Sequence, residues 1–317
     1  MRALVTGGSG FIGSHLVDRL LREGHSVDVV DDLSSGSLAN LSIAREFRRE
    51  LRFHQVDVRD VMVTELIVRR QPDTVFHLAA QASVPTSIDD PGLDAEVNVV
   101  GSVRVIEGAV RAGAKKIVYA ASGGTLYGEA RRAADEAQAY RPLSPYGVSK
   151  KVVLDYLIAY RERCGLEFTA LALANVYGPR QRSDGEGGVV AIFASELIAG
   201  VPSTIDGDGS QIRDFVYVDD VVDAFVRASE KGGGLVCNIG TGKGTTIKRL
   251  YATMAEAAGI EMAPHFGPRR LGDVRANVLS PERSRLHLGW RPFTSLRDGL
   301  SVSLADAAER PSAGSRR

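Results

Sequence analysis

The feature that most constrains the fold is a glycine-rich turn near the N-terminus. Gly7, Gly10 and Gly13 form the pattern G-x-x-G-x-x-G between an apolar run at 2–6 and an amphipathic segment, and a second apolar run follows at 26–32. Strand, glycine turn, helix and strand make a βαβ unit, whose turn brings backbone amides and a helix N-terminus close to a pyrophosphate. The sequence therefore predicts a dinucleotide site formed by Gly7, Gly10, Phe11, Ile12 and Gly13.

The same alternation of strand and helix patterns continues along much of the chain. Strands are predicted at 51–58, 73–80, 114–122 and 167–178, and helices at 63–72, 93–113 and 144–165. Repeated units of this length predict an α/β protein with a Rossmann fold, which is a doubly wound parallel sheet.

After Gly178 the pattern loosens into a glycine-rich loop and then mixed helix and strand patterns. We therefore expect residues 1–178 to form the dinucleotide-binding domain, with segments near 214–240 returning to it. Residues 179–310 are expected to form a smaller C-terminal α/β lobe that binds the substrate, and residues 311–317 a disordered tail.

Two carboxylates at the end of the second predicted strand favour NAD over NADP. Asp31 and Asp32 can accept hydrogen bonds from the adenosine ribose hydroxyls, and the next arginine along the chain is Arg45. A 2′-phosphate would face both carboxylates without a cation. Further cofactor contacts are predicted at the ends of the third and fourth strands, at Asp57, Val58, Leu78, Ala79 and Ala80. His77 is expected to be a packed strand histidine rather than a base.

Tyr146 and Lys150 are four residues apart on a predicted helix and therefore share a face. A phenol with a pKa of about 10 is a weak base at neutral pH. A nearby ammonium and the positive nicotinamide of NAD both favour the phenolate. We therefore expect Tyr146 to remove a proton from a substrate hydroxyl while the carbon that bears it is oxidised, with Lys150 as its partner and as a contact to the cofactor.

With these motifs the chain resembles the extended short-chain dehydrogenase/reductase family, in particular NAD-dependent nucleotide-sugar epimerases of the UDP-glucose (UDP-galactose) 4-epimerase type. The motifs that carry the resemblance are TGGSGFIG from Thr6, DD from Asp31, DV from Asp57, HLAAQASV from His77, SPYGVSK from Ser144, NVYGPRQ from Asn175, GDGSQIRDFVYVDDVVDA from Gly207, NIGTG from Asn238 and RLGD from Arg270. The resemblance extends over roughly residues 2–300.

The resemblance implies roles for residues outside the glycine turn and the Tyr–Lys pair. It places Asn98 near the cofactor and Tyr177 near the nicotinamide. For the substrate it implies Asn175 at the sugar diphosphate, Val189 and Phe193 at the uracil, and Arg213, Arg270 and Asp273 at the phosphates and the uridine ribose. Arginine suits this last role because its guanidinium offers bidentate donors to phosphate.

Two positions bear on how the family pattern applies to this chain. Gly123 stands where the family has a Ser or Thr that hydrogen-bonds to the reacting hydroxyl. Either Ser122 or Thr125 must substitute for it, or a water does, and we expect both side chains at the catalytic site and near the substrate. Thr125 is preferred because the loop after the strand should point it towards the sugar.

Asn277 stands where the family limits space near the sugar, and its intermediate size leaves room for an N-acetyl or C6-modified sugar.

The resemblance implies 4-epimerisation of a UDP-hexose of the UDP-glucose/UDP-galactose type through a 4-keto intermediate. The alternatives are epimerisation of a UDP-N-acetylhexosamine or of UDP-glucuronate, and dehydration or decarboxylation of a nucleotide sugar. Gly124 and Thr125 stand where dehydratases of the family have an Asp-Glu pair, which disfavours dehydration. Arg180 or Arg182 could hold the carboxylate of a uronate. A non-catalytic NAD-binding regulator would usually lack the tyrosine or the lysine.

Composition argues against several other classes of protein. The 39 basic and 39 acidic residues balance, which disfavours a surface for nucleic acid. No apolar run approaches the roughly 18 residues of a membrane span, and the start of the chain has no signal-peptide layout. Cys164 and Cys237 lack metal-ligand spacing, so no metal is expected, and both are expected to be reduced in a cytoplasmic enzyme. The expected partners are the UDP-sugar and a second copy of the chain, because the family forms homodimers through helices that correspond to 98–111 and 146–160.

Overall fold

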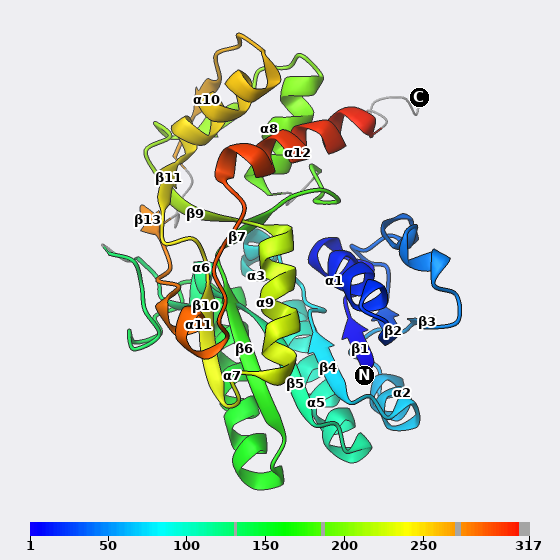
Figure 1. Cartoon of the computed structure of the whole chain (residues 1–317). Coiled ribbons are helices and arrows are strands. Elements are labelled where there is room, and N and C mark those ends of the chain that lie inside the picture. The colour runs from blue at the N-terminus through cyan, green and yellow to red at the C-terminus, as the bar shows by residue number, and fades with distance from the viewer. Residues whose placement is uncertain (130–131, 185–187, 270–273, 311–317) are drawn as a thin grey trace.

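The computed structural model describes residues 1–129, 132–184, 188–269 and 274–310, and its largest sheet has seven parallel strands (Figure 1). Their order is β10-β6-β5-β4-β1-β2-β3. The strands are β1 Arg2–Thr6, β2 Ser26–Asp31, β3 Leu51–Gln55, β4 Thr74–His77, β5 Lys116–Ser122, β6 Glu167–Leu173 and β10 Leu235–Ile239. Strand order reverses between β1 and β4, which is the switch point of a doubly wound sheet. The predicted fold class is therefore confirmed.

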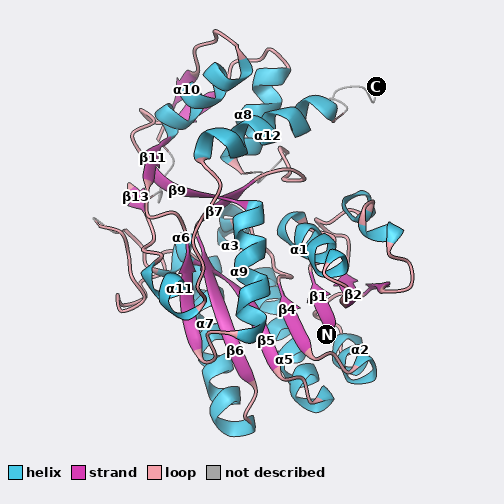
Figure 2. Ribbon diagram, viewed as in Figure 1, coloured by secondary structure: helices cyan, strands magenta, loops and turns pink. Residues whose placement is uncertain are grey.

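The central strands are buried on both faces, which explains why their sequences are nearly continuous apolar runs. In β1 only Arg2 is exposed, and residues 116–121 of β5 are all buried. Helices α1 (Phe11–Arg22) and α9 (Val218–Glu230) pack together over one face of the sheet. Helices α2 (Met62–Arg70), α5 (Gly101–Ala112) and α7 (Pro145–Cys164) pack in a row over the other (Figure 2).

The helix predicted at 93–113 is divided into three parts. After α3 (Val84–Asp89), the chain forms α4 (Pro91–Ala95), the π-helix η3 (Glu96–Val100) and then α5. The π turn contains Asn98, whose Nδ2 donates both to Asp94 and to the backbone oxygen of Gln81. Wide turns of this kind often occur beside functional sites.

The strand predicted at 167–178 is two strands in two different sheets. β6 ends at Leu173, and β7 (Asn175–Tyr177) pairs with β9 (Ile212–Tyr217). Ala174 lies between them, and its N–H donates to the backbone oxygen of Ile239 in β10. The chain therefore leaves the large sheet at Ala174 and enters the smaller part of the molecule.

The smaller part consists of short strands and three helices that pack on one another. Its strands are β7 and β9 with β11 (Gly244–Thr246) and β13 (Ala276–Asn277), and the pair β8 (Thr204–Asp206) and β12 (His265–Gly267). Its helices are α8 (Val189–Ile198), α10 (Ile247–Ala258) and α12 (Leu296–Glu309). Short helical segments elsewhere are η1 Leu38–Leu41, η2 Ala44–Glu46, α6 Gly123–Leu126 and α11 Glu282–His287.

The chain also returns to the large sheet, because β10 pairs in parallel with β6. The division into domains at residue 178 stays a prediction. The predicted tail 311–317 lies outside the described residues. Within the described ranges, none of the helices combines the length and the apolar character needed to cross a membrane.

Candidate active site

A cavity of about 830 Å³ lies at the carboxyl ends of the strands of the large sheet. Its lining comes from the residues that follow the strands: Gly7 after β1, Asp32 after β2, Asp57 after β3, Leu78, Ala79 and Ala80 after β4, and Ala174 after β6. Doubly wound sheets bind ligands at this edge, beside the switch point. The volume is within the range of sites for small molecules and cofactors.

The glycine turn is packed so closely that side chains would not fit in it. Gly7 has a φ of +68°, and a Cβ there would lie 2.7 Å from the backbone nitrogen of Ala79. A Cβ on Gly13 would lie 2.1 Å from the backbone oxygen of Gly7. Gly10 then starts α1 without a side-chain cap, so the first amides of this helix face the cavity next to Phe11 and Ile12. This arrangement suits a pyrophosphate.

Asp31 is held against the glycine turn and lines the cavity. Its carboxylate accepts hydrogen bonds from the N–H groups of Ser9 (2.9 Å) and Leu33 (2.9 Å). Burial raises the pKa of this carboxyl, and the two hydrogen bonds act in the opposite direction. Asp32 also lines the cavity and accepts from the N–H and the hydroxyl of Ser34. Both carboxylates therefore lie where ribose hydroxyls are expected.

Two arginines that are distant from Asp31 in the sequence line the cavity together with Asp31 and Asp32. The sequence argument against NADP did not take them into account. Arg59 binds both oxygens of Asp57 at 2.6–3.1 Å, and Arg182 binds both oxygens of Asp184 at 2.8–2.9 Å. Each guanidinium is therefore already paired with a carboxylate. No sequence spacing could have revealed Arg182, because a long loop brings it to the end of β2.

Tyr146 and Lys150 lie in the first turns of α7 and both line the cavity. The helix starts at Pro145, after Ser144 accepts a hydrogen bond from the N–H of Gly147. Lys150 Nζ lies 5.8 Å from the centre of the Tyr146 ring and donates to the backbone oxygen of Ala120 at 3.1 Å. The predicted pair therefore shares one face of the helix and points into the cavity.

Burial shifts both groups towards their neutral forms. It raises the pKa of Tyr146 to about 12, and a hydrogen bond with Ser122 acts against this shift. It lowers the pKa of Lys150 to about 8, and the negative charge of Asp94 acts against this shift. A phenolate at Tyr146 consequently depends on the Ser122 hydroxyl and on nearby positive charge.

The structure places Ser122 at the cavity and Thr125 away from it, so the geometry favours Ser122 although Thr125 is preferred from the sequence. Ser122 lines the cavity and hydrogen-bonds to Tyr146. The Thr125 hydroxyl donates to the backbone oxygen of Ser122 at 3.4 Å. The Thr125 side chain packs against Gly147 of α7, because a Cβ added to Gly147 would lie 3.2 Å from the Cβ of Thr125. Because Thr125 is turned towards the helix, it supports the loop and does not line the cavity.

Gly123 is a glycine because the C-terminal part of the chain packs directly on it. A Cβ at this position would lie 2.4 Å from Cδ1 of Leu279 and 3.0 Å from the backbone oxygen of Ala172. Asn277, on β13, donates from Nδ2 to the backbone oxygens of Gly123 (3.3 Å) and Gly124 (3.2 Å). These contacts fix the loop that carries Ser122.

Two residues that were expected at the cofactor are packed elsewhere. The Asn98 side chain binds the N–H and the backbone oxygen of Gln81, so it positions Gln81, which lines the cavity, and does not line it itself. Tyr177 is buried with its hydroxyl towards the backbone oxygen of Leu296 in α12. Side chains alternate along β7, so Val176 faces the cavity instead.

Phe193, which was expected at the substrate, is also buried in the smaller part. It packs edge-to-face on Tyr251 with ring centres 5.3 Å apart. The roles of Asn175, Val189 and Arg213 at the substrate stay predictions. Asn175 donates to the backbone oxygen of Asp214 and Arg213 to that of Ile212. Arg270 and Asp273 lie outside the described residues.

The prediction that His77 is a packed strand histidine is confirmed. Its two ring nitrogens bind the hydroxyls of Thr6 and Ser102, each at 2.7 Å. Burial lowers its pKa to about 3. His77 is therefore a neutral part of the packing below the cavity.

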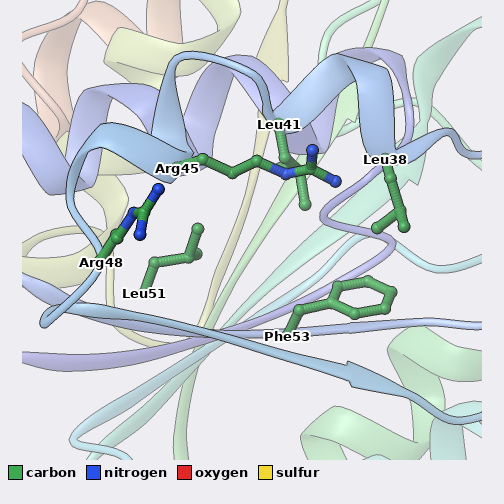
Figure 3. Close-up of a pocket in the computed structure, with 6 residues that line it drawn as sticks. All are labelled: Leu38, Leu41, Arg45, Arg48, Leu51 and Phe53. Carbon is green, nitrogen blue, oxygen red and sulfur yellow. The ribbon is translucent and has the colours of Figure 1, made fainter.

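A second hollow, of about 380 Å³, lies on the outer edge of the sheet beside β3 (Figure 3). It is lined by Leu38, Leu41, Arg45, Arg48, Leu51 and Phe53. None of these side chains is an acid or a nucleophile, and the hollow is separate from the Tyr–Lys pair. The larger cavity is therefore the candidate active site. Within the described ranges, the acidic, histidine and cysteine side chains form no group that could hold a metal ion.

A doubly wound sheet with this glycine turn, an acidic residue at the end of β2 and a Tyr–Lys pair that lines the cavity defines an enzyme of the extended short-chain dehydrogenase/reductase class. Residues 3–240 match the NAD dependent epimerase/dehydratase family, and the chain belongs to this family.

Relatives of known description match nearly the whole chain. A UDP-glucose 4-epimerase of Mycolicibacterium smegmatis is 48% identical over 306 residues, which are 96% of this chain and 97% of that protein. The UDP-glucose 4-epimerase of Thermotoga maritima, solved with UDP-glucose, has a TM-score of 0.93 and 43% identity and covers 96% of this chain and 98% of that one. The enzyme of the same description from Thermus thermophilus, solved with NAD, has a TM-score of 0.91 and 40% identity and covers 98% and 99%.

The cofactor is NAD, and the residues present fit it. The open amides at the start of α1 suit the pyrophosphate, and the carboxylates of Asp31 and Asp32 suit unphosphorylated ribose hydroxyls. The Tyr–Lys pair lines the same cavity, where a reacting group would meet the nicotinamide.

Proposed function

We propose that this protein catalyses the NAD-dependent 4-epimerisation of a UDP-hexose of the UDP-glucose/UDP-galactose type. The observation that carries the proposal is the set of Ser122, Tyr146 and Lys150, which line one cavity with the glycine turn. The similarity to proteins described as UDP-glucose 4-epimerases over nearly the whole chain supports it.

The chain's own residues have defined tasks in this reaction. NAD, when bound, supplies the reversible oxidation at C4 that interconverts the two epimers through a 4-keto sugar. Tyr146 accepts the proton of the 4′-hydroxyl as a phenolate and returns it when the hydroxyl forms again. Ser122 donates a hydrogen bond to that phenolate, and the charge of Lys150 stabilises it.

The alternatives have less support from the site. Arg180 and Arg182, the arginines considered for a uronate carboxylate, are paired with Asp18 (2.6 Å) and Asp184. No acid stands at Gly124 or Thr125 to assist dehydration. A regulator without activity would not need the Tyr–Lys pair that lines the cavity. Conversion of a UDP-N-acetylhexosamine is compared with that of UDP-galactose in the assay below.

The proposal is tested by proton NMR of the purified protein with catalytic NAD and UDP-galactose. The expected result is UDP-glucose at the equilibrium ratio, with slower or no conversion of UDP-N-acetylgalactosamine and UDP-galacturonate in parallel samples. If none of the three is converted by protein that binds NAD, the proposed function is wrong.

Ser122→Ala is expected to lower kcat roughly 10- to 100-fold, because it removes a hydrogen bond to a charged group. The same bond lowers the pKa of Tyr146, so its loss raises that pKa, and the acidic limb of the kcat profile should move to higher pH. Thr125→Val is the matched control, and we expect less than about a threefold effect. A loss at Thr125→Val as large as that at Ser122→Ala would restore Thr125 as the catalytic hydroxyl.

Asp31→Asn is expected to raise the Kd for NAD roughly 10- to 100-fold, because charge-assisted hydrogen bonds to the ribose become neutral ones. Isothermal titration calorimetry measures this change. Asp73→Asn is the control, since Asp73 lies at the opposite end of the sheet, where it binds the N–H of Arg2. An unchanged Kd in Asp31→Asn would show that Asp31 only holds the glycine turn.

We also propose a cytoplasmic homodimer. The outer surfaces of η3 and α7 support an interface, because Val100, Val148 and Ile158 are 45%, 47% and 50% exposed. Large apolar side chains that share a surface commonly mark contacts between subunits. Size-exclusion chromatography with light scattering gives the mass in solution, and a monomer at micromolar concentration would refute the dimer.

A further inference from the structure

The ammonium of Lys150 lies over the ring of a second tyrosine, behind the reacting pair. Tyr119, on β5, is 1% exposed, and Lys150 Nζ lies 5.0 Å from its ring centre. This distance is within the range of cation–π interactions. Tyr119 does not line the cavity and has no part in the chemistry described above.

The buried ammonium has few polar partners. Lys150 is 3% exposed and donates one hydrogen bond, to the backbone oxygen of Ala120. The carboxylate of Asp94 acts on it through its charge, but that carboxylate already accepts hydrogen bonds from Gln81 and Asn98. Removing an ammonium from water without compensation favours the neutral amine. Any further contact that favours the charged form will therefore have a measurable effect on this group.

The ring of Tyr119, and not its hydroxyl, can supply this stabilisation. The hydroxyl is buried without a hydrogen-bond partner among the described residues, so it adds an unsatisfied polar group. The ring, in contrast, stacks on His77 at 5.7 Å between centres. His77 is neutral because both of its nitrogens are engaged and buried, so it places no second positive charge against the ring.

We propose that Tyr119 is a positioning residue that holds Lys150 in its charged form beside Tyr146 through the face of its ring. The expected effect on the pH profile of kcat rests on the proposed function. The expected effect on the protonation of Lys150 rests on the geometry around that residue alone. The titratable groups around Lys150 are Asp94 from α4, Tyr146 from α7, Tyr119 from β5 and His77 from β4. The carboxylate of Asp94 acts on Lys150 through its charge, and the ring of Tyr119 adds to that effect.

The test compares Tyr119→Leu with Tyr119→Phe. Leucine removes the ring, and phenylalanine keeps it and removes only the unpaired hydroxyl. The first readout is the ¹³Cε chemical shift of Lys150 against pH in protein labelled with ¹³C-lysine, assigned by its absence in Lys150→Arg. We expect the midpoint to fall by about half to one pH unit in Tyr119→Leu and to stay at the wild-type value in Tyr119→Phe.

The second readout is the pH profile of kcat for UDP-galactose. Its alkaline limb should move to lower pH by the same amount in Tyr119→Leu, and Tyr119→Phe should restore the wild-type profile. The NMR midpoint needs no turnover, so an inactive wild-type protein would sink the proposed function and leave this inference to be decided by the first readout.

If Tyr119→Leu does not fold, Tyr119 is replaced with pentafluorophenylalanine, which keeps an aromatic ring at this position and reverses the charge density on its face. The Lys150 midpoint should then fall at least as far as expected for leucine. A wild-type midpoint in the fluorinated protein, or an equal shift in Tyr119→Phe, would overturn the proposal.

Discussion

Tyr146→Phe is expected to lower kcat about 10³-fold while the protein still folds and binds NAD. Phenylalanine keeps the ring that packs near Lys150 and removes the only atom of this side chain that can accept the proton of the substrate. Loss of a general base typically costs between 10² and 10⁴ in rate. The rate of conversion of UDP-galactose, measured under single-turnover and steady-state conditions, gives the size of the loss.

The control for this variant is Tyr140→Phe, since Tyr140 lies outside the cavity and packs on Tyr127 with ring centres 5.6 Å apart. Its activity should remain within about twofold of wild type. The assignment of Tyr146 as the base fails if Tyr146→Phe keeps more than about a tenth of the wild-type kcat, because a remote contact could account for so small an effect.

Gly13→Ala is expected to destabilise the protein by about 3 kcal/mol and to remove measurable NAD binding. Gly13 lies within α1, where alanine is intrinsically favoured by about 1 kcal/mol. The new methyl group would lie 2.1 Å from the backbone oxygen of Gly7 and 2.9 Å from Cα of Gly8. Both neighbours are backbone atoms, so the helix and the glycine turn must separate, at the cost typical of overpacking.

Thermal unfolding with and without NAD measures both effects. The Tm should fall by roughly 5–10 °C, and NAD should no longer raise it. Gly113→Ala is the matched control, because Gly113 has a φ of +68° but nothing within 4 Å of an added Cβ. It should cost only about 1 kcal/mol of backbone strain and leave NAD binding unchanged. Similar results for the two variants would mean that the close approach at Gly13 is unimportant.

The parts of the site that depend on short spacings could be predicted from the sequence. The glycine turn, Asp31 and the Tyr146–Lys150 pair each lie within one strand, turn or helix, whose geometry is regular. A helix places residues four apart on one face whatever surrounds it. These residues do line one cavity.

The parts that depend on the orientation of a loop or an isolated strand could not be predicted. A shift of one residue reverses the face of a strand, and this is why Val176 lines the cavity while Tyr177 does not. The choice between Ser122 and Thr125 could not be made from the sequence for a similar reason, because α6 turns Thr125 towards α7. Arg182 meets the end of β2 only through tertiary folding.

The contact between Gly123 and Leu279 restricts how the sequence of this protein can change over generations. A serine at position 123 would supply the hydroxyl expected from the family pattern, but its Cβ would lie 2.4 Å from Leu279. Shortening Leu279 first would open a cavity in the core, which costs roughly 2–5 kcal/mol. The effects of the two replacements are therefore expected to be coupled, because a shorter residue at 279 makes room for a side chain at 123. A change from Ser122 to a hydroxyl at position 123 would therefore pass most easily through a prior change at Leu279.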